Sequence, residues 1–141
     1  MKKLIVMFLA VAAVSSIGFP AFAANGASGS KVRAYYFHGT FRCATCYRLE
    51  QYSKEAIEAN FEDAISSGKL RFRVINVDDK GNEHYIKDYQ LYTKSLILSL
   101  VKDGKEIKWK NLDKIWDYVG DEQRFVDYVN TNVADFLKEA Q

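Results

Sequence analysis

The sequence predicts an α/β domain with a central mixed sheet of about four strands flanked by helices, in the order β-α-β-α-β-β-α-α. Short β-branched and aromatic runs, typical of buried strands, alternate with longer stretches whose apolar residues recur at helical spacing. An Asp-Gly pair at 103–104 separates two strand-like runs and predicts a hairpin. Strands separated by helices are expected to pair in parallel through right-handed crossovers, so the hairpin supplies the antiparallel edge.

The predicted elements follow one another with few residues between them. Strands are expected at 32–37, 70–77, 96–101 and in the alternating stretch around 107–109. Helices are expected at 43–65, 83–91, 112–119 and, after an Asp121 cap, 125–137. Gly68 is expected to end the first helix.

Residues 1–23 have the pattern of a secretory signal peptide. Two lysines precede the apolar run Leu4–Val14, and Ala21-Phe22-Ala23 is an A-x-A site with cleavage expected after Ala23. The alternative is an uncleaved membrane anchor, since Leu4–Ala24 is just long enough to cross a bilayer. Cleavage predicts a secreted, periplasmic or otherwise extracytoplasmic protein with no membrane insertion afterwards.

The chain that remains is expected to consist of a flexible leader, 24–31, and one domain of ordinary length, 32–141. The signal takes away two of the 20 basic residues and none of the 18 acidic ones, so the mature chain is formally neutral. This balance indicates neither a nucleic acid nor an anionic membrane as the partner.

Cys43 and Cys46 are the only cysteines, and they lie at the start of a predicted helix. A thiol there faces unpaired backbone N–H groups and the positive end of the helix dipole, which both favour the reactive thiolate. Even cysteine numbers in exported proteins often mean structural disulfides. A bridge that closes so small a loop would contribute only about 2 kcal/mol to stability. The spacing therefore favours a redox-active disulfide.

A strand, a Gly-containing turn, Cys43-Ala44-Thr45-Cys46 at a helix start, and then strand, helix, hairpin and helix resemble the thioredoxin-like superfamily over roughly 32–137. The resemblance implies a thioredoxin fold in which Cys43 is the exposed nucleophile and Cys46 the resolving thiol. The family's cis-proline is missing, because the only proline is Pro20, and Lys94 or Ser95 takes its place.

Two further positions differ from the family. The place of its buried acid corresponds to Phe37, with His38 beside it, and Arg42 replaces the tryptophan before the first cysteine. Because positive neighbours lower a thiol's pKa, we expect Arg42 and Lys94 to lower the pKa of Cys43 and make its disulfide more oxidising. His38 is a candidate proton relay for Cys46. Plainer interpretations are a solvated loop charge for Lys94, a turn residue for His38 and the steering of an anionic partner for Arg42.

The leading hypothesis is an exported thiol–disulfide oxidoreductase that exchanges electrons with protein thiols and disulfides, with a membrane redox protein as a further candidate partner. We expect no cofactor and no metal, because the two thiols carry the electrons themselves. One alternative is a binding module whose reduced dithiol captures a soft ion such as Cu(I) or As(III). Against it, the chain has no third thiol, and Lys94 and Arg42 would repel a cation. The other alternative is a redox-inactive interaction domain that has the thioredoxin fold.

Overall fold

The computed structural model describes residues 29–141, so the predicted signal peptide and most of the predicted leader lie outside the described residues. The strands of this part of the chain are β1 (Ser30–His38), β2 (Leu70–Asn76), β3 (Ser95–Lys102) and β4 (Lys105–Asn111). Its helices are α1 (Ala44–Asn60), α2 (Glu62–Ser66), α3 (His84–Asp88), α4 (Ile115–Tyr118) and α5 (Glu122–Glu139).

The predicted fold class is confirmed: helices flank a mixed four-stranded sheet with the strand order β2-β1-β3-β4. β1 and β2 are parallel, as expected. The expected parallel pairing was wrong for β3, which runs antiparallel to β1. The reason is the length of α3, which has five residues and spans only about 8 Å. It cannot carry the chain back along the sheet, so β3 starts at the end where β2 stops.

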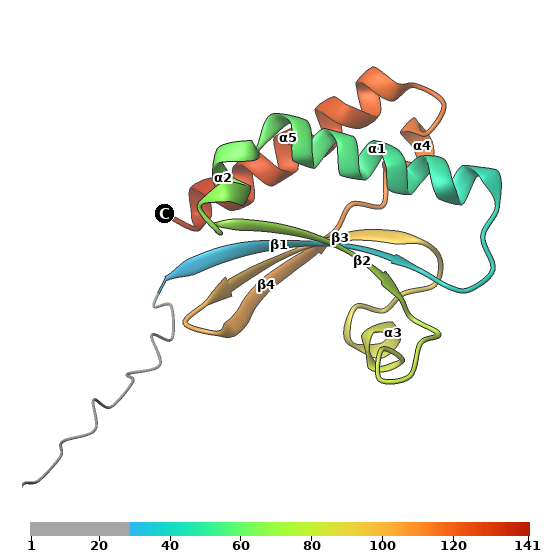
Figure 1. Ribbon diagram of the computed structural model, residues 1–141, viewed down its shortest axis with the longest axis horizontal. Helices are drawn as coiled ribbons and strands as arrows, with labels where there is room; N and C mark the ends of the chain where they lie inside the picture. The colour runs from blue at the N-terminus through green and yellow to red at the C-terminus, as the bar shows by residue number, and fades with distance from the viewer. Residues whose placement is uncertain (1–28) are drawn as a thin grey trace, which may run out of the picture.

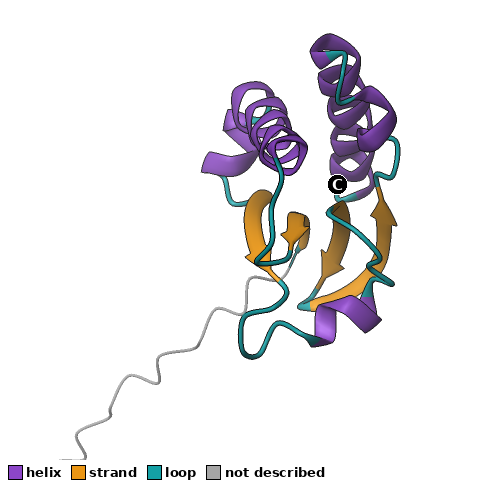
Figure 2. Cartoon of the chain, turned by 90° about the vertical axis from the view of Figure 1, so that its right-hand side faces the viewer, coloured by secondary structure: helices purple, strands orange, loops and turns teal. Residues whose placement is uncertain are grey.

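The sheet separates two apolar clusters of different size. α1 and α5 lie side by side on one face, and α3 lies against the other face near the carboxyl ends of β1 and β2 (Figures 1 and 2). Successive side chains of β1 point to opposite faces of the sheet, so Tyr36 belongs to the larger cluster and Phe37 to the smaller one. The larger cluster includes Leu49, Ile57, Phe125 and Val129, and the smaller one consists of Tyr35, Phe37, Ile75, Tyr89 and Ile97.

The predicted Asp-Gly hairpin is confirmed. Asp103 has φ +49° and Gly104 has φ +80°, so both residues adopt the left-handed conformation that a two-residue turn between twisted strands requires. β3 and β4 then pair in antiparallel register. The predicted Asp121 cap is also confirmed, since its carboxylate accepts a hydrogen bond from Arg124 N at 3.1 Å.

The prediction of one continuous helix over 43–65 was wrong, because the helix breaks at Phe61. This residue has φ −132° and ψ 33°, outside the helical region, while its ring packs against the larger cluster. The Asn60 side chain also donates to the Ala56 carbonyl at 2.9 Å, in competition with the helical backbone. The chain resumes as α2, and Gly68, with φ +72°, ends it.

Other element ends differ by a few residues from the prediction. β1 begins at Ser30, two residues earlier than expected, and α3 and α4 are shorter than the helical patterns around them. Within residues 29–141, no helix combines the length and the apolar character needed to cross a bilayer.

Candidate redox-active site

Cys43 and Cys46 lie where the chain leaves β1 and enters α1. Cys43 is the N-cap of α1, with extended backbone, and its Sγ accepts a hydrogen bond from Cys46 N at 3.4 Å. The two Sγ atoms are 2.6 Å apart, and both cysteines are free thiols. Cys43 is exposed, whereas Cys46 is 2% exposed. The pair therefore consists of one accessible sulfur and one buried sulfur in hydrogen-bond contact.

The contact with Cys46 lowers the pKa of the Cys43 thiol. The largest cause is the hydrogen bond from the Cys46 thiol, followed by the one from the Cys46 backbone N–H, with a smaller contribution from Thr45 N–H. All three donors stabilise the thiolate. The direction is the one expected from the sequence, and the backbone N–H groups of the helix start are among the causes, as expected; the largest cause, the Cys46 thiol, is not the cation that was also expected.

Tyr36 holds the backbone of Cys46 from the interior side of the sheet. Its side chain is fully buried, and its hydroxyl donates to the Cys46 carbonyl at 2.7 Å. Burial is the main reason why the pKa of Tyr36 lies far above its usual value. The phenol therefore remains a donor at all working pH values and anchors the backbone of Cys46 to β1.

Arg42 contacts two residues of α1. Its guanidinium forms an ion pair with Glu50 and lies 4.1 Å from the centre of the Tyr47 ring. The Arg42 and Glu50 side chains are only 13% and 25% exposed, so the pair is partly shielded from water. The Arg42 charge, which was expected to act on Cys43, is therefore paired with Glu50, a residue that was not among the predicted site residues.

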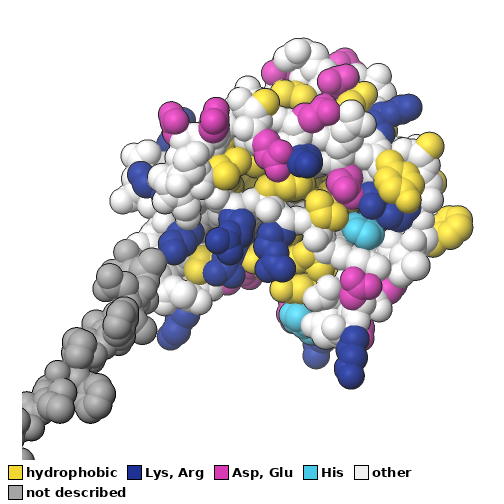
Figure 3. All heavy atoms as spheres, viewed as in Figure 1, with side chains coloured by type: hydrophobic (Ala, Val, Ile, Leu, Met, Phe, Trp, Pro, Cys, Tyr) yellow, Lys and Arg dark blue, Asp and Glu magenta, His cyan; other side chains and the backbone are white. Residues whose placement is uncertain are grey.

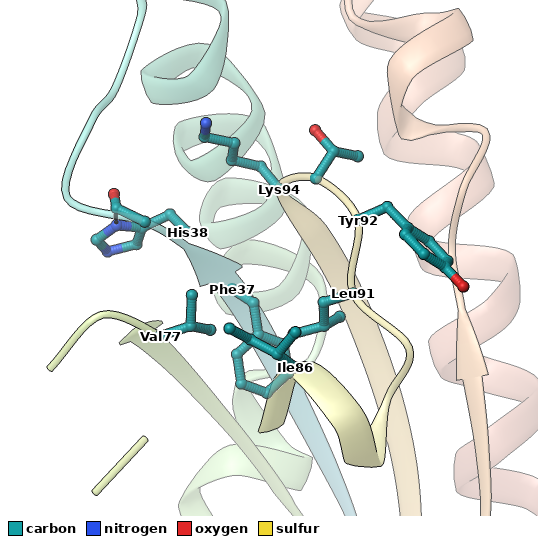
Figure 4. A pocket seen from close by; sticks show the side chains of 9 residues that line it. Phe37, His38, Val77, Ile86, Leu91, Tyr92 and Lys94 are labelled. Carbon is teal, nitrogen blue, oxygen red and sulfur yellow. Dashed lines mark hydrogen bonds between the residues drawn. The ribbon is translucent and has the colours of Figure 1, made fainter. Parts of the chain in front are cut away.

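The structure brings His38 and Lys94 to the same hollow. Figure 4 shows them at one side of a cavity of about 220 Å³, with the apolar side chains of Phe37, Ile86 and Leu91 below them. His38 Nδ1 lies 2.9 Å from the Gly39 carbonyl, which places a proton on Nδ1.

The loop that carries Lys94 is fixed by α4. The Lys94 carbonyl accepts a hydrogen bond from the Trp116 indole at 2.9 Å. At this loop the resemblance to thioredoxins implied a missing cis-proline, and no peptide bond within residues 29–141 is cis.

Asp78 lies near the site and was not among the residues predicted from the sequence. Its Oδ2 accepts a hydrogen bond from Thr40 N at 2.6 Å, which ties the turn before Cys43 to the loop after β2. A side chain at Gly39 would meet the same carboxylate at 3.0 Å. The available signal was its position, just after the end of a strand that pairs in parallel with β1.

The Asp78 contact predicts a specific pH dependence. The hydrogen bonds from Thr40 are the main cause that lowers the pKa of Asp78, and the charges of His38 and Lys94 lower it further. A carboxyl whose folded pKa is lowered stabilises the fold at pH values above its unfolded pKa, and loses this effect as the pH falls through the folded value. We therefore expect the Thr40 amide to stay protected from hydrogen exchange down to about pH 4, the usual carboxyl value, and to lose protection below it. NMR titration checks this. Loss of protection near neutral pH would contradict the contact.

Lys94→Gln is expected to leave the pKa of Cys43 unchanged within about 0.3, because donors on α1, and not the ammonium of Lys94, are the main causes of its lowering. The pH dependence of thiolate absorbance measures this value. The Asp78 carboxyl of the same variant is the control: its pKa, followed by NMR, should rise, because the Lys94 charge is one of the causes that lower it. A rise of one or more in the Cys43 pKa of Lys94→Gln would show instead that Lys94 tunes the thiol.

Exposed aromatic side chains accompany the cysteines. Phe41 is 84% exposed, Tyr47 57% and Tyr92 95%. Phe41 and Tyr47 flank the Cys43–Cys46 segment, and Tyr92 lies on the loop that carries Lys94. Apolar surface at this end of the molecule is suited to contact with another polypeptide. Phe41 could have been found from its place in a short turn, where neither strand nor helix would bury it.

No three His, Cys, Asp or Glu side chains between residues 29 and 141 lie close enough together to hold a metal ion.

The order of the elements and of the strands decides the architecture. The chain has a thioredoxin-like fold. Among solved structures, Fasciola hepatica thioredoxin is 16% identical, with 81% of this chain and 84% of that chain covered and a TM-score of 0.43. Thioredoxin O2 from Arabidopsis thaliana in the oxidized state is 12% identical, with 68% of this chain and 76% of that chain covered and a TM-score of 0.41.

Trxlp from Edwardsiella tarda is 18% identical, with 77% of this chain and 90% of that chain covered and a TM-score of 0.42. No protein-family model matches the sequence, and no curated protein is significantly similar to it. Likenesses of this size say nothing about chemistry, so the function has to be argued from the cysteines and their surroundings.

Proposed function

We propose that the protein is a thiol–disulfide oxidoreductase that exchanges electrons with protein thiols and disulfides through Cys43 and Cys46. The observation that carries the proposal is the pairing of an exposed N-cap thiol, whose pKa is lowered, with a buried thiol 2.6 Å away. An exposed thiolate is the group that attacks a disulfide, and a second thiol at this distance can release the mixed disulfide.

The exchange takes place in two displacement steps. The Cys43 thiolate attacks one sulfur of a partner disulfide, whose S–S bond breaks, and the other partner sulfur leaves as a thiolate that takes up a proton. Cys46 then loses its proton and attacks the Cys43 sulfur, which forms the Cys43–Cys46 disulfide and releases the second partner thiolate. Two electrons have passed to the partner, and its two thiolates have taken up two protons, one matching the proton lost by Cys46 and one from the solvent. The reverse sequence oxidises a partner dithiol.

The lowered pKa of Cys43 makes the Cys43–Cys46 disulfide a stronger oxidant than one formed by a thiol with the ordinary pKa. Hydrogen bonds that stabilise the thiolate stabilise the reduced protein, and therefore make its disulfide the stronger oxidant. The exposed rings of Phe41, Tyr47 and Tyr92 offer contact area for a partner polypeptide around the reacting sulfur.

The test is an equilibrium titration of the purified chain in glutathione buffers of defined potential, with alkylation and mass spectrometry to count free thiols. We expect one two-electron transition to an intramolecular Cys43–Cys46 disulfide, and catalytic turnover of a disulfide-containing peptide. Cysteines that react with glutathione independently and give no turnover would contradict the proposal. Tight one-to-one capture of Cu(I) or As(III) without turnover would support the binding module instead.

We further propose that the protein works outside the cytoplasm after cleavage behind Ala23, which the pattern of residues 1–23 supports. A membrane redox protein is then the candidate partner that resets the cysteine pair. Mass spectrometry of the protein from an exporting host is expected to give Ala24 as the first residue. A full-length, membrane-bound product would show that the segment is an anchor.

A further inference from the structure

Four basic residues gather on the sheet face that α1 and α5 leave uncovered. Arg33 is directly opposite Arg71 in the parallel register, and Tyr35 is opposite Arg73. Since Tyr35 belongs to the smaller cluster, these arginines share its face of the sheet. Arg33 and Arg71 also line a hollow of about 110 Å³ together with Lys31. We call Lys31, Arg33, Arg71 and Arg73 the basic patch.

The basic patch has no acidic partner within residues 29–141. None of its four side chains is within 4.0 Å of a carboxylate, although five other basic side chains of this part of the chain are. Asp88 and Glu106 line a hollow with Arg33, but Glu106 accepts hydrogen bonds from Tyr89 and Ser99 instead. Like charges opposite each other across a strand pair destabilise a sheet. The patch is thus an uncompensated positive surface in a nearly neutral chain.

Charge is segregated over the molecule. In Figure 3 dark-blue side chains gather beside the sheet, whereas magenta side chains lie over the helical layer. The acidic residues of α1, α2 and α5 are Glu50, Glu55, Glu58, Glu62, Asp63, Glu122, Asp127, Asp135 and Glu139. A partner for the basic patch is therefore expected to be acidic.

The same part of the sheet has an open edge. β2 pairs only with β1 among the described strands. Val32 N donates to Lys69 O, and Val77 N donates to His38 O, so the odd-numbered residues of the β2 segment face β1. The N–H and C=O groups of Phe72 and Val74 therefore point away from β1, and no hydrogen bond within residues 29–141 occupies them.

We propose that β2 and the basic patch bind an extended acidic segment of a partner polypeptide, which adds as a strand to the β2 edge. Arg71 and Arg73 are two residues apart on one face, so a bound strand with acidic residues at alternate positions would place its carboxylates beside them. The open N–H and C=O groups favour a polypeptide over a lipid or phosphate surface, because only a strand satisfies both.

The basic residues of β4, the other edge strand, have partners that those of β2 lack. β4 also carries basic residues, but Lys108 forms an ion pair with Glu139 at 2.7 Å, and Lys110 donates to Asn132 at 2.7 Å. These lysines are held against α5 and protect that edge from pairing. The arginines of β2 have no comparable contact.

This binding surface is separate from the cysteines. Arg33 is five residues before His38 on β1, a separation of roughly 17 Å along the strand, and the cysteines lie beyond that end. The interaction is therefore independent of the proposed redox function, and it can be tested in a Cys43→Ser/Cys46→Ser variant.

The experiment measures binding of a labelled peptide of alternating glutamate and threonine by fluorescence anisotropy at low salt. We expect saturable binding that weakens as salt screens the charges. Arg71→Gln/Arg73→Gln should weaken it about fivefold or more, because two exposed charge pairs are lost. Lys54→Gln/Lys138→Gln removes the same charge from the helical layer and should change the affinity less than about twofold.

Three comparison peptides separate strand addition from simple charge attraction. Grouping the glutamates at one end, or methylating the backbone nitrogens that face β2, should weaken binding, whereas methylating the other nitrogens should not. Equal binding by all three would overturn strand addition. The Arg71→Gln/Arg73→Gln variant is expected to be at least as stable to urea as the wild type, so that lost binding does not report lost folding.

If the basic patch binds something other than an acidic strand, the binding measurements differ from those expected above, and each such result overturns the proposal. Binding to phosphatidylglycerol vesicles without peptide binding would assign the patch to a membrane surface. Self-association in sedimentation that is abolished by Arg71→Gln/Arg73→Gln, again without peptide binding, would assign it to a second copy. No binding to any of these would mean that the arginines only guard the edge of β2.

Discussion

Cys43→Ser is expected to abolish turnover of a disulfide-containing peptide, with a loss of about a thousandfold or more. A serine hydroxyl is not ionised at working pH and cannot form a disulfide. Cys46→Ser leaves the attacking thiol in place but removes the sulfur that lies 2.6 Å from it. It is therefore expected to accumulate mixed disulfides with the peptide through Cys43, which non-reducing mass spectrometry detects.

The matched control is Ala44→Ser, which adds a hydroxyl between the cysteines at an exposed position and leaves both thiols in place. It should retain turnover within about twofold, because both sulfurs and the backbone N–H groups that donate to Cys43 remain. Turnover by Cys43→Ser, or a Cys46→Ser variant that forms no mixed disulfide, would contradict the assigned roles.

Phe125→Ala is expected to destabilise the protein by about 3–5 kcal/mol. Phe125 is fully buried, and its ring meets the Tyr52 ring of α1 edge-on with a centroid distance of 5.5 Å. Truncation would leave a cavity between α1 and α5, the two helices that cover the larger cluster. The loss is a large share of the about 5–15 kcal/mol that stabilises a typical domain. Urea unfolding monitored by circular dichroism measures it.

Phe41→Ala provides the comparison for the same change of side chain. Phe41 is 84% exposed, so its removal should change the free energy of unfolding by less than about 0.5 kcal/mol. If both variants unfolded at the same urea concentration, the α1–α5 packing described for Phe125 would be wrong.

Much of the fold could be predicted from local patterns. The Asp103-Gly104 hairpin was predictable because few residue pairs adopt two left-handed conformations in succession. The direction of β3 was not predictable, because a strand's own pattern does not specify the direction of its neighbour. The helix break at Phe61 was not predictable either, because the helical spacing of apolar residues continues from α1 into α2.

The parts of the site that could be predicted are those formed by residues close together in the sequence. Cys43 at the helix start and Cys46 one turn later follow from their spacing. The ion pair of Arg42 with Glu50 depends on how the turn before α1 is directed, and the contact of Asp78 with Thr40 joins two loops 38 residues apart. Neither can be read from a local pattern.

The most direct test is the pH dependence of alkylation of the reduced protein, with mass spectrometry to identify the modified cysteine. The exposed Cys43 should react first, while Cys46 stays protected. Because the Cys46 thiol and the backbone N–H groups lower the pKa of Cys43, the midpoint of its reaction rate should lie below about 8.5, the value of a free cysteine. Equal modification of both cysteines, or a Cys43 midpoint at or above that value, would contradict the assignment of Cys43 as the activated thiol.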